Sequence, residues 1–391
     1  MANGRAQRVS IANDPRARAV LYQGLLATAL VGLAYLAWSN AVANMQARGV
    51  PMGFGFWDET AGFDINQTLI PYSALSTYGR AFWVGLLNTL LVGAVSIALA
   101  TPLGFAVGLA RLAPNWLLSR IALVYVELTR NTPLLLQLFF WYNAVLKTLP
   151  SPHQSVNIGG AFFLNNRGLY LPRPVFSDGA WLVGAALALA AGLAVALALA
   201  GRRRQVATGE RSQDLWSALT LIVGLPTVAY FAAHRPIGFE VAQLAGFNLH
   251  GGIEIHPEFA ALVFGLVTYT AGFIAEIVRA GVLAVPRGQS EAAAALGLHR
   301  PLALRLIIVP QALRLITPPL TSQYLNIVKN SSLAVFVGYP DLVLVFAGTV
   351  LNQTHAALQV MAVTMAVYLA VSLVVSFALN LFDARNALKE R

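Results

Sequence analysis

Charged side chains stand inside otherwise apolar stretches of this 391-residue chain, where they could line or gate a polar passage. Glu127 and Arg130 are three residues apart, and so are Glu276 and Arg279. Residues at that spacing meet on one face of a helix. A charge inside a membrane helix is costly and usually faces protein or a water-filled path. Each pair therefore either lines such a path or neutralises itself and pins neighbouring helices, and Arg279 could also extend to the membrane interface.

Amide and hydroxyl groups accompany these charges in two clusters, at 127–137 and 329–332, and Pro133 would loosen the helix of the first. Such groups can replace water around a charged solute without trapping it. Lys329 would meet a carboxylate on the solute or, equally, bind a backbone carbonyl at a helix end. The candidate lining residues are Glu127, Arg130, Asn131, Thr132, Gln137, Glu276, Lys329, Asn330, Ser331 and Ser332.

Residues for catalysis or for metal binding are not grouped along the chain. There is no cysteine, which excludes disulfides, thiolate metal sites and a cysteine nucleophile. The six histidines are scattered, and none has a zinc-ligand spacing such as H-E-x-x-H. No G-x-x-x-x-G-K-[ST] sequence is present to cradle the phosphates of ATP. We therefore expect no metal or cofactor in this chain and no chemistry catalysed by it alone.

The elements that position these residues are membrane helices. The chain is 57% hydrophobic and 11% charged, whereas a soluble domain is about 25% charged. A helix needs about 20 apolar residues to cross the bilayer, and this predicts an all-α integral membrane protein with about eight transmembrane helices. The predicted spans are Val20–Trp38, Ala81–Ala110, Ile121–Leu146, Ala180–Ala200, Leu215–Ala233, Phe259–Arg279, Gln311–Asn330 and Ala356–Phe382.

Two of these regions need comment. The seventh span is the least clear because Pro318, Pro319 and Lys329 weaken its hydropathy, and Ser332–Val350 adds an apolar piece that we expect to be a re-entrant or periplasmic helix. The first span has a 19-residue core, too long for a typical signal peptide, so we expect a retained anchor.

The positive charge follows the ends of the spans. The net charge is +10, but no basic stripe with interleaved aromatics appears, which argues against nucleic acid. Most of the 26 Lys and Arg residues lie in the N-terminal arm, the loops at 111–120 and 202–211, the segment 279–314 and the tail. The positive-inside rule puts these parts, and both termini, in the cytoplasm. The outer segments Gly49–Tyr78 and Lys147–Gly179 could hold short strands or helices, and we expect no independent domain there.

A polar helical segment on the cytoplasmic side stands out among the apolar ones. Ala292–Ala295 favours helix, Gly297 suits a left-handed turn that ends it, and Pro301 suits the start of a second helix. A compact exposed helix-turn-helix of this kind on a membrane protein needs a partner to dock against.

The sequence Glu291 to Pro310 resembles the EAA loop of ABC-importer permeases, E-A-A-x3-G-x9-I-x-L-P, with Val309 for the leucine. The resemblance implies ATPase coupling through Arg287, Gly288, Glu291, Ala292, Ala293, Gly297 and Leu298.

Further stretches narrow the family. Tyr125–Leu138 resembles the Y-x-E-x-x-R-G-T-P-L-L-x-Q pattern of permeases for polar amino acids, with Asn131 where glycine is usual. Thr270–Gln289 resembles the sequence that precedes the EAA loop in that family, and Lys329–Leu333 resembles the K-D/N-T/S-S-L that follows it. The extra first span and the interruption of the core look like the larger Q-type or B-type permease of the general L-amino acid (Aap/Bzt) systems.

This resemblance implies an organisation and a set of partners. It implies a five-helix type I importer core in 81–146 and 258–391, with the EAA loop at 285–310, preceded by an N-terminal part at 1–80 and interrupted by a two-helix insertion at 147–257. It implies a second homologous permease, a dimeric cytoplasmic ATPase that binds ATP and Mg, a periplasmic amino-acid-binding protein and residence in the bacterial inner membrane. Transport would proceed by alternating access between core bundles.

Three alternatives remain open on the sequence alone. A secondary transporter or channel would need no ATPase, and the polar segment 285–310 argues against it. A membrane enzyme would need a convergent acid/base or metal cluster, and the sequence offers none. An importer of a sugar, metal or peptide would keep the ABC class, but the stretches around Arg130 and Glu276 favour amino acids.

Overall fold

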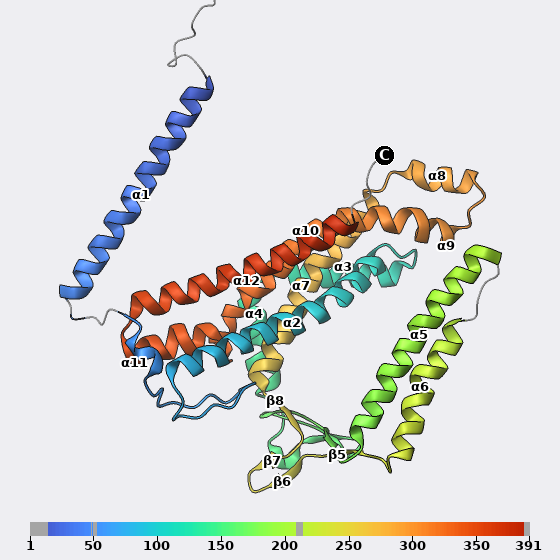
Figure 1. Cartoon of the computed structure of the whole chain (residues 1–391), viewed down its shortest axis with the longest axis horizontal. Helices are drawn as coiled ribbons and strands as arrows, with labels where there is room; N and C mark the ends of the chain where they lie inside the picture. The colour runs from blue at the N-terminus through green and yellow to red at the C-terminus, as the bar shows by residue number, and fades with distance from the viewer. Residues whose placement is uncertain (1–14, 48, 50–52, 209–213, 387–391) are drawn as a thin grey trace, which may run out of the picture. The chain divides into compact units, whose positions relative to one another are not determined.

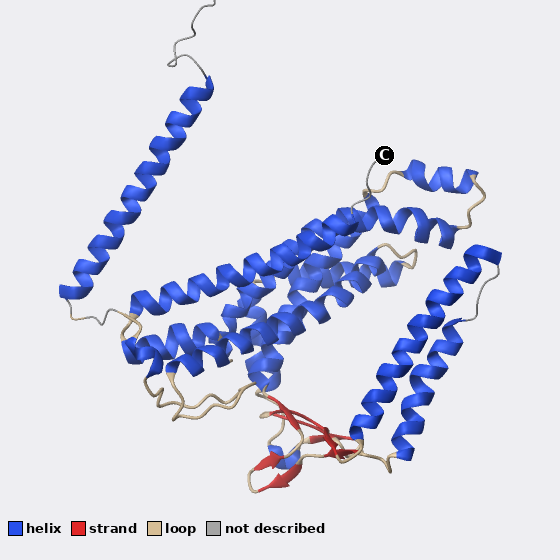
Figure 2. Cartoon of the chain, in the orientation of Figure 1, coloured by secondary structure: helices blue, strands red, loops and turns tan. Residues whose placement is uncertain are grey.

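The computed structural model describes residues 15–47, 49, 53–208 and 214–386, and helices make up most of that part (Figure 2). Contacts divide the chain into two compact units, which are described separately. Unit 1 comprises Met1–Gly93, Tyr324–Val335 and Pro340–Arg391. Unit 2 comprises Ala94–Gln323 and Phe336–Tyr339.

Unit 1 is built around an aromatic core. Its elements are α1 (Pro15–Ala47), η2 (Gly55–Asp58), the first part of α2 (Tyr78–Arg111), the last turns of α10 (Val309–Asn330), most of η6 (Ser331–Val337), η7 (Val343–Val350), α11 (Leu351–Thr354) and α12 (Ala357–Asn386). Phe56, Phe82 and Phe346 pack together, with the Phe82 and Phe346 rings 5.1 Å apart and tilted at 72°. This edge-on packing fixes the short helix η2 against α2 and η7.

The apolar piece Ser332–Val350 is helical in two parts. The helix η6 ends at Val337, and Gly338 takes a left-handed φ of 79°, so the chain turns before η7 begins. The turn is fastened to α2: the Asn88 amide donates to the Pro340 carbonyl at 2.9 Å, and the Leu342 N–H donates to the Thr89 hydroxyl at 3.0 Å. The segment is therefore two short helices joined by a turn rather than one continuous helix.

Unit 2 is organised around α7 (Pro257–Leu283), its most buried helix. Around it lie the second part of α2, α3 (Trp116–Asn131), α4 (Leu134–Phe139), the π-helix η3 (Phe140–Leu146) and the first part of α10. Glycines on α7 let these neighbours approach closely. A Cβ at Gly265, Gly272 or Gly281 would overlap Leu138, Thr129 or Ile316 in turn. Small residues at helix contacts are typical of membrane packing.

Among the described residues, six helices are long and apolar enough to cross a membrane. They include the predicted spans except the third and the fifth, which contribute shorter apolar helices at Leu134–Leu146 and Trp216–Ala232. The helix α10 continues through Pro318 and Pro319 despite the lost N–H groups. The six long helices lie at Arg18–Ala47, Tyr78–Arg111, Ala180–Gln205, Pro257–Leu283, Arg300–Val337 and Ala357–Leu379.

The prediction of one continuous third span, Ile121–Leu146, is wrong. The helix α3 ends at Asn131, and Thr132 is extended, with φ −99° and ψ 126°, before α4 starts at Leu134. Pro133 explains the break, because it has no N–H for the helix ladder and disfavours helical angles at the residue before it. From Phe140 the same segment continues as a π-helix.

Between its helices, unit 2 also contains short antiparallel strands (Figure 2). A four-stranded sheet has the order β1-β2-β3-β8, and two further pairs, β4 with β5 and β6 with β7, lie outside it. Tyr170, 1% exposed, centres this region, and its hydroxyl donates to Glu254 at 2.8 Å. Burial and this hydrogen bond raise the pKa of Tyr170 above its usual range. The strands are β1 (Val156–Ile158), β2 (Phe162–Asn165), β3 (Gly168–Leu171), β4 (Arg173–Phe176), β5 (Ile237–Glu240), β6 (Gln243–Ala245), β7 (Asn248–His250) and β8 (Ile253–Ile255).

A helical hairpin interrupts the strands. The helices α5 (Ala180–Thr208) and α6 (Asp214–Ala232) run side by side and pack on each other (Figure 1). Apolar side chains such as Leu189 and Val195, 57% and 59% exposed, remain on the outside of α5. An exposed apolar surface of this kind is what a helix presents to lipid or to another membrane protein.

Candidate functional site

The polar segment after α7 folds as two short helices joined by a glycine turn. The helix α8 spans Arg287–Ala295 and α9 spans Arg300–Ala303, followed by the π-helix η5 (Leu304–Ile308) and then α10 (Figure 1). Gly297 has φ 73°. The Leu298 N–H donates to the Ala293 carbonyl at 3.0 Å, and the Gly297 N–H donates to Ala294 at 2.9 Å. These two bonds make a Schellman motif, so the predicted left-handed helix stop at Gly297 is confirmed.

One face of this helix-turn-helix is exposed. Ala293 is 1% exposed and packs inward, whereas Arg287, Gly288, Glu291 and Ala292 are exposed and Leu298 is half-buried. Leu296 at the turn is 78% exposed, next to the polar residues of α8. The Gln311 amide donates to Gln289 at 3.3 Å and links α8 to the start of α10.

The break between α3 and α4 is closed by a side chain. The Gln137 amide donates to the carbonyls of Thr129 and Thr132, at 2.9 and 3.0 Å. Both carbonyls lie at the end of α3, where the interrupted helix supplies no N–H partner. In this structure Gln137 therefore completes the backbone hydrogen bonding at the break, and the half-buried Thr132 is the extended residue within it.

Glu127 and Arg130 do not form an ion pair with each other. Glu127 accepts a hydrogen bond from the Asn131 amide at 3.0 Å, one helical turn along α3. The Arg130 guanidinium lies 5.3 Å from the centre of the Phe273 ring on α7, a cation–π contact. Of the two alternatives for this pair, the self-neutralising ion pair is not formed, because Asn131 and Phe273 provide other partners.

The second predicted pair does form, and it has a third member. Arg279 binds Glu276 with its Nη2 2.6 Å from Oε1. Arg111, the last residue of α2, donates to the other oxygen of Glu276. Sequence analysis missed Arg111 because it is remote in sequence and was assigned to a topology-determining loop. One carboxylate therefore joins α7 to the end of α2.

Lys329, Asn330, Ser331 and Ser332 lie in unit 1, where α10 gives way to η6. The Ser331 hydroxyl donates to the Val328 carbonyl and the Ser332 hydroxyl to the Lys329 carbonyl, each at 2.7 Å. Ser331 is fully buried, whereas Lys329 is exposed. The two hydroxyls thus bond to the end of their own helix.

A buried carboxylate in unit 1 was also missed. Asp341 is 0% exposed; its Oδ1 accepts from the Leu344 N–H at 2.8 Å, and its Oδ2 accepts from the Tyr368 hydroxyl at 3.4 Å. Asp341 thus caps the first turn of η7. The available signal was that it is the one Asp or Glu residue between Glu291 and Asp383.

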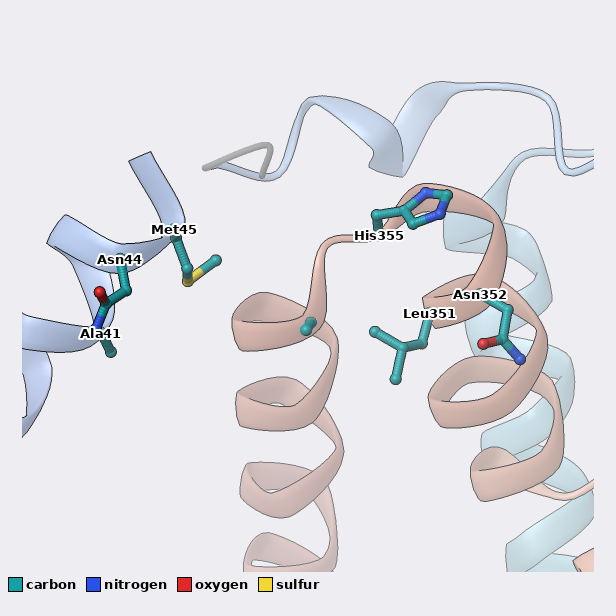
Figure 3. Close-up of a pocket in the computed structure, with 7 residues that line it drawn as sticks. Ala41, Asn44, Met45, Leu351, Asn352 and His355 are labelled. Atoms are coloured by element: carbon teal, nitrogen blue, oxygen red, sulfur yellow. The ribbon is translucent and has the colours of Figure 1, made fainter. Parts of the chain in front are cut away.

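Among the described residues, no cluster of metal ligands accompanies these groups, and a hollow is lined by other residues. In the part of the chain that the structure describes, no three His, Asp or Glu residues are grouped so that they could hold a metal ion. A hollow of about 620 Å³ lies in unit 1 and is largely open (Figure 3). Its lining is mostly apolar, with amides from Asn44 and Asn352 and the ring of His355, and it contains none of the predicted site residues.

Comparison with known proteins gives a consistent result. Residues 100–387 match the family described as binding-protein-dependent transport system inner membrane component. YhdX of Escherichia coli K12, provisionally assigned as an amino-acid ABC transporter permease, is 51% identical over 98% of this chain and 97% of its own length. AapQ of Rhizobium johnstonii, the permease of a general L-amino acid transport system, is 48% identical over 97% of this chain and 94% of its own. BztB of Rhodobacter capsulatus, the permease of a glutamate/glutamine/aspartate/asparagine transport system, is 42% identical over 97% of this chain and 96% of its own length.

Proposed function

The chain belongs to the family of binding-protein-dependent transport system inner membrane components, and from this premise we propose how it is coupled, oriented and partnered. It is a permease subunit of an amino acid ABC importer and not an enzyme, because ATP hydrolysis in such importers belongs to a separate ATPase. It is a multi-pass protein of the inner membrane. The proposal concerns which segments serve this function.

The coupling element is the segment α8–α9. The observation that carries this proposal is an exposed polar helix ended by a Schellman turn, with Leu296 78% exposed beside it. A partner groove that accepts α8 would cover Leu296 and the exposed face of Glu291 and Ala292. The partner is a dimeric cytoplasmic ATPase that binds ATP and Mg. The segment and both chain termini then lie in the cytoplasm, in agreement with the distribution of Arg and Lys.

The test replaces Gly297 with valine. A β-branched residue at φ 73° is strained, so the turn will open and misplace α9. We expect the variant to insert but to lose ATPase binding or ATP-driven uptake. Asparagine tolerates the left-handed conformation, so Gly297→Asn should remain active. Gly246→Val, at φ 64° in the β6–β7 turn, applies the same strain elsewhere and should leave ATPase binding intact.

Normal ATPase binding and normal uptake in Gly297→Val would refute the assignment of α8–α9. So would equal losses in Gly246→Val, since strain at any turn would then explain the result.

The transported solute is a polar or general L-amino acid, delivered by a periplasmic amino-acid-binding protein, and the route is shared with a second, homologous permease. Support comes from the names of AapQ and BztB, both of which match nearly the whole chain. The transport core is 81–146 and 258–391, and 147–257 is an insertion. Co-purification of the complex, followed by uptake into vesicles from a panel of amino acids, tests partners and substrate together. Transport without a binding protein or an ATPase would contradict the proposal.

A further inference from the structure

Glu276 holds two arginines that come from different helices of unit 2. Arg279 lies one turn further along α7, and its guanidinium contacts both carboxylate oxygens, at 2.6 to 3.2 Å. Arg111 ends α2 and donates to the same carboxylate. The side chains of Arg111, Glu276 and Arg279 are 11%, 26% and 31% exposed. We call these three residues the Glu276 clamp.

Close to the Glu276 clamp, the helices α2 and α7 make a tight contact. A Cβ on Gly108 of α2 would come within 2.7 Å of the Ala275 carbonyl oxygen and 2.9 Å of Val278 Cβ. The backbones of α2 and α7 are therefore as close as side chains permit, and the clamp fastens them at the end of α2. Without Glu276, two half-buried guanidinium groups would face each other, and their repulsion would part the helix ends.

A short, stiff link joins the clamp to the coupling segment. Only Ala284–Pro286 separates α7 from α8. The Ala284 N–H donates to Ala280 at 2.9 Å, and the Gln289 N–H donates to Pro286 at 3.0 Å. Pro286 has its φ fixed near −58°. A displacement of α8 must therefore move the end of α7 rather than be absorbed in a flexible loop.

Two hydrogen bonds connect α3, the helix that precedes the break at Pro133, to the end of α2 and to α7. The Ser119 hydroxyl of α3 donates to the Arg111 carbonyl at 3.0 Å, and the Tyr125 hydroxyl donates to the Thr268 carbonyl of α7 at 2.7 Å. The helix α3 is thus attached to the end of α2 and to the middle of α7. It ends at Asn131, beside the break that Gln137 closes.

We propose that the Glu276 clamp is the connection through which movement of α8 reaches α2 and α3, and that Glu276 and Arg111 are positioning residues for coupling rather than contacts for the amino acid. The inference rests on the proposed docking of the ATPase at α8. With the clamp closed, α7 and α2 move together when α8 is displaced. With it open, α8 and α7 move while the end of α2, and the start of α3 that Ser119 binds to it, stay behind, so ATP is hydrolysed without transport.

The experiment measures uptake and ATP hydrolysis on the same liposomes containing the whole importer. The variants are Glu276→Gln, Arg111→Gln and Arg111→Lys, with Glu258→Gln as the matched control. Glu258 is a carboxylate at the other end of α7, where it accepts from the Tyr142 hydroxyl at 2.8 Å. We expect Glu276→Gln and Arg111→Gln to bind the ATPase and to hydrolyse ATP, while uptake per ATP falls by at least about fivefold. Arg111→Lys keeps the charge and should retain most of the uptake per ATP. Glu258→Gln should have the same uptake per ATP as the wild type.

Three results would overturn the proposal. One is an unchanged uptake per ATP, and another is a parallel fall of uptake and ATP hydrolysis, which marks a structural defect. The third is a changed preference among amino acids while uptake per ATP stays constant. If Glu276→Gln does not assemble, the Arg111 variants decide, because they leave the Glu276–Arg279 pair in place. Loss of ATPase binding is a separate readout and bears on the docking of α8, which the Gly297 variants test independently.

Discussion

Polar groups in the apolar part of this chain differ in what their hydrogen bonds hold together. Gln137, Ser331 and Ser332 bond to backbone carbonyls at helix ends, and Glu276 bonds between helices. Lys329 is exposed at the end of α10, one residue before the change to η6. Among the candidate lining residues, Lys329 therefore carries an accessible charge, as do the exposed Glu127 and Arg130.

Replacing Lys329 with alanine should weaken uptake without preventing assembly. Loss of a hydrogen bond to a charged solute costs about 1.5–3 kcal/mol, roughly ten- to a hundredfold in affinity. Uptake and basal ATP hydrolysis measured on the same purified variants provide the check. Thr317→Ala on the same helix is the control, because Thr317 is not a candidate lining residue and its hydroxyl bonds to the Leu313 carbonyl at 2.7 Å. Unchanged uptake in Lys329→Ala and Asn330→Ala would place the route elsewhere, including wholly in the partner permease.

Sequence identified these residues but did not establish their partners. Spacing along one helix predicts that Glu276 and Arg279 meet, and they do. The same spacing fails for Glu127 and Arg130, because Phe273 on another helix attracts the arginine. Arg111 was missed for the same reason: its partner is 165 positions away along the chain. Contacts between distant helices depend on packing, which local spacing does not encode.

At the scale of elements, α7 is the helix on which unit 2 packs. Glycines on α7 receive side chains from α3, α4 and α10, and glycines on α2 receive side chains from α7. Close approach of this kind depends on the absence of a Cβ. The consequence is a packed bundle in which small residues, rather than large apolar ones, set the distances between helices.

Gly108→Ala should destabilise the protein, whereas Gly93→Ala on the same helix should not. The new methyl group at Gly108 would lie 2.7 Å from a backbone oxygen, and overpacking of this kind costs about 1–3 kcal/mol. At Gly93 the nearest atom is a Val328 methyl group at 3.7 Å, an ordinary contact, and alanine favours helix. Thermal unfolding of the detergent-solubilised protein compares the two, and equal melting temperatures would contradict the close approach.

Most helices were predictable because an apolar run of about 20 residues in a membrane must satisfy its own backbone hydrogen bonds, which a helix does. The third span was not, since its hydropathy is continuous while Pro133 interrupts its backbone. The turn at Gly297 was predictable because glycine and its flanking helix formers determine it locally. Strand β8 was not foreseen, because its pairing with β3 depends on residues that follow two helices.

At the scale of the whole molecule, α5 and α6 form a hairpin that lengthens the chain without contributing to the clamp or to the broken helix. They pack on each other, and the outer face of α5 is apolar. We propose that they support the core or the partner permease and take no part in the route.

A polar substitution on α5 should therefore affect folding more than selectivity. Leu189 is 57% exposed in the middle of the helix, so Leu189→Gln places an amide against lipid or a partner. We expect a lower yield of assembled importer and an unchanged ratio of uptake between amino acids in the complex that does form. Competition among amino acids, measured per assembled complex, provides the test. A shifted preference at full assembly would make the hairpin part of the route.

The pairing of β3 with β8 also determines how the chain threads the membrane. Leu169 pairs with Ile255 and Leu171 with Ile253, so the residues on either side of the hairpin must emerge on the same face of the bilayer. The chain between them must cross an even number of times. Since α5 is long and apolar enough to cross, we expect α6 to return across the bilayer although its apolar stretch, Trp216–Ala232, is short. During synthesis the sheet is completed only after that return, so a chain in which α6 failed to insert would leave β8 on the opposite face, unable to reach β3.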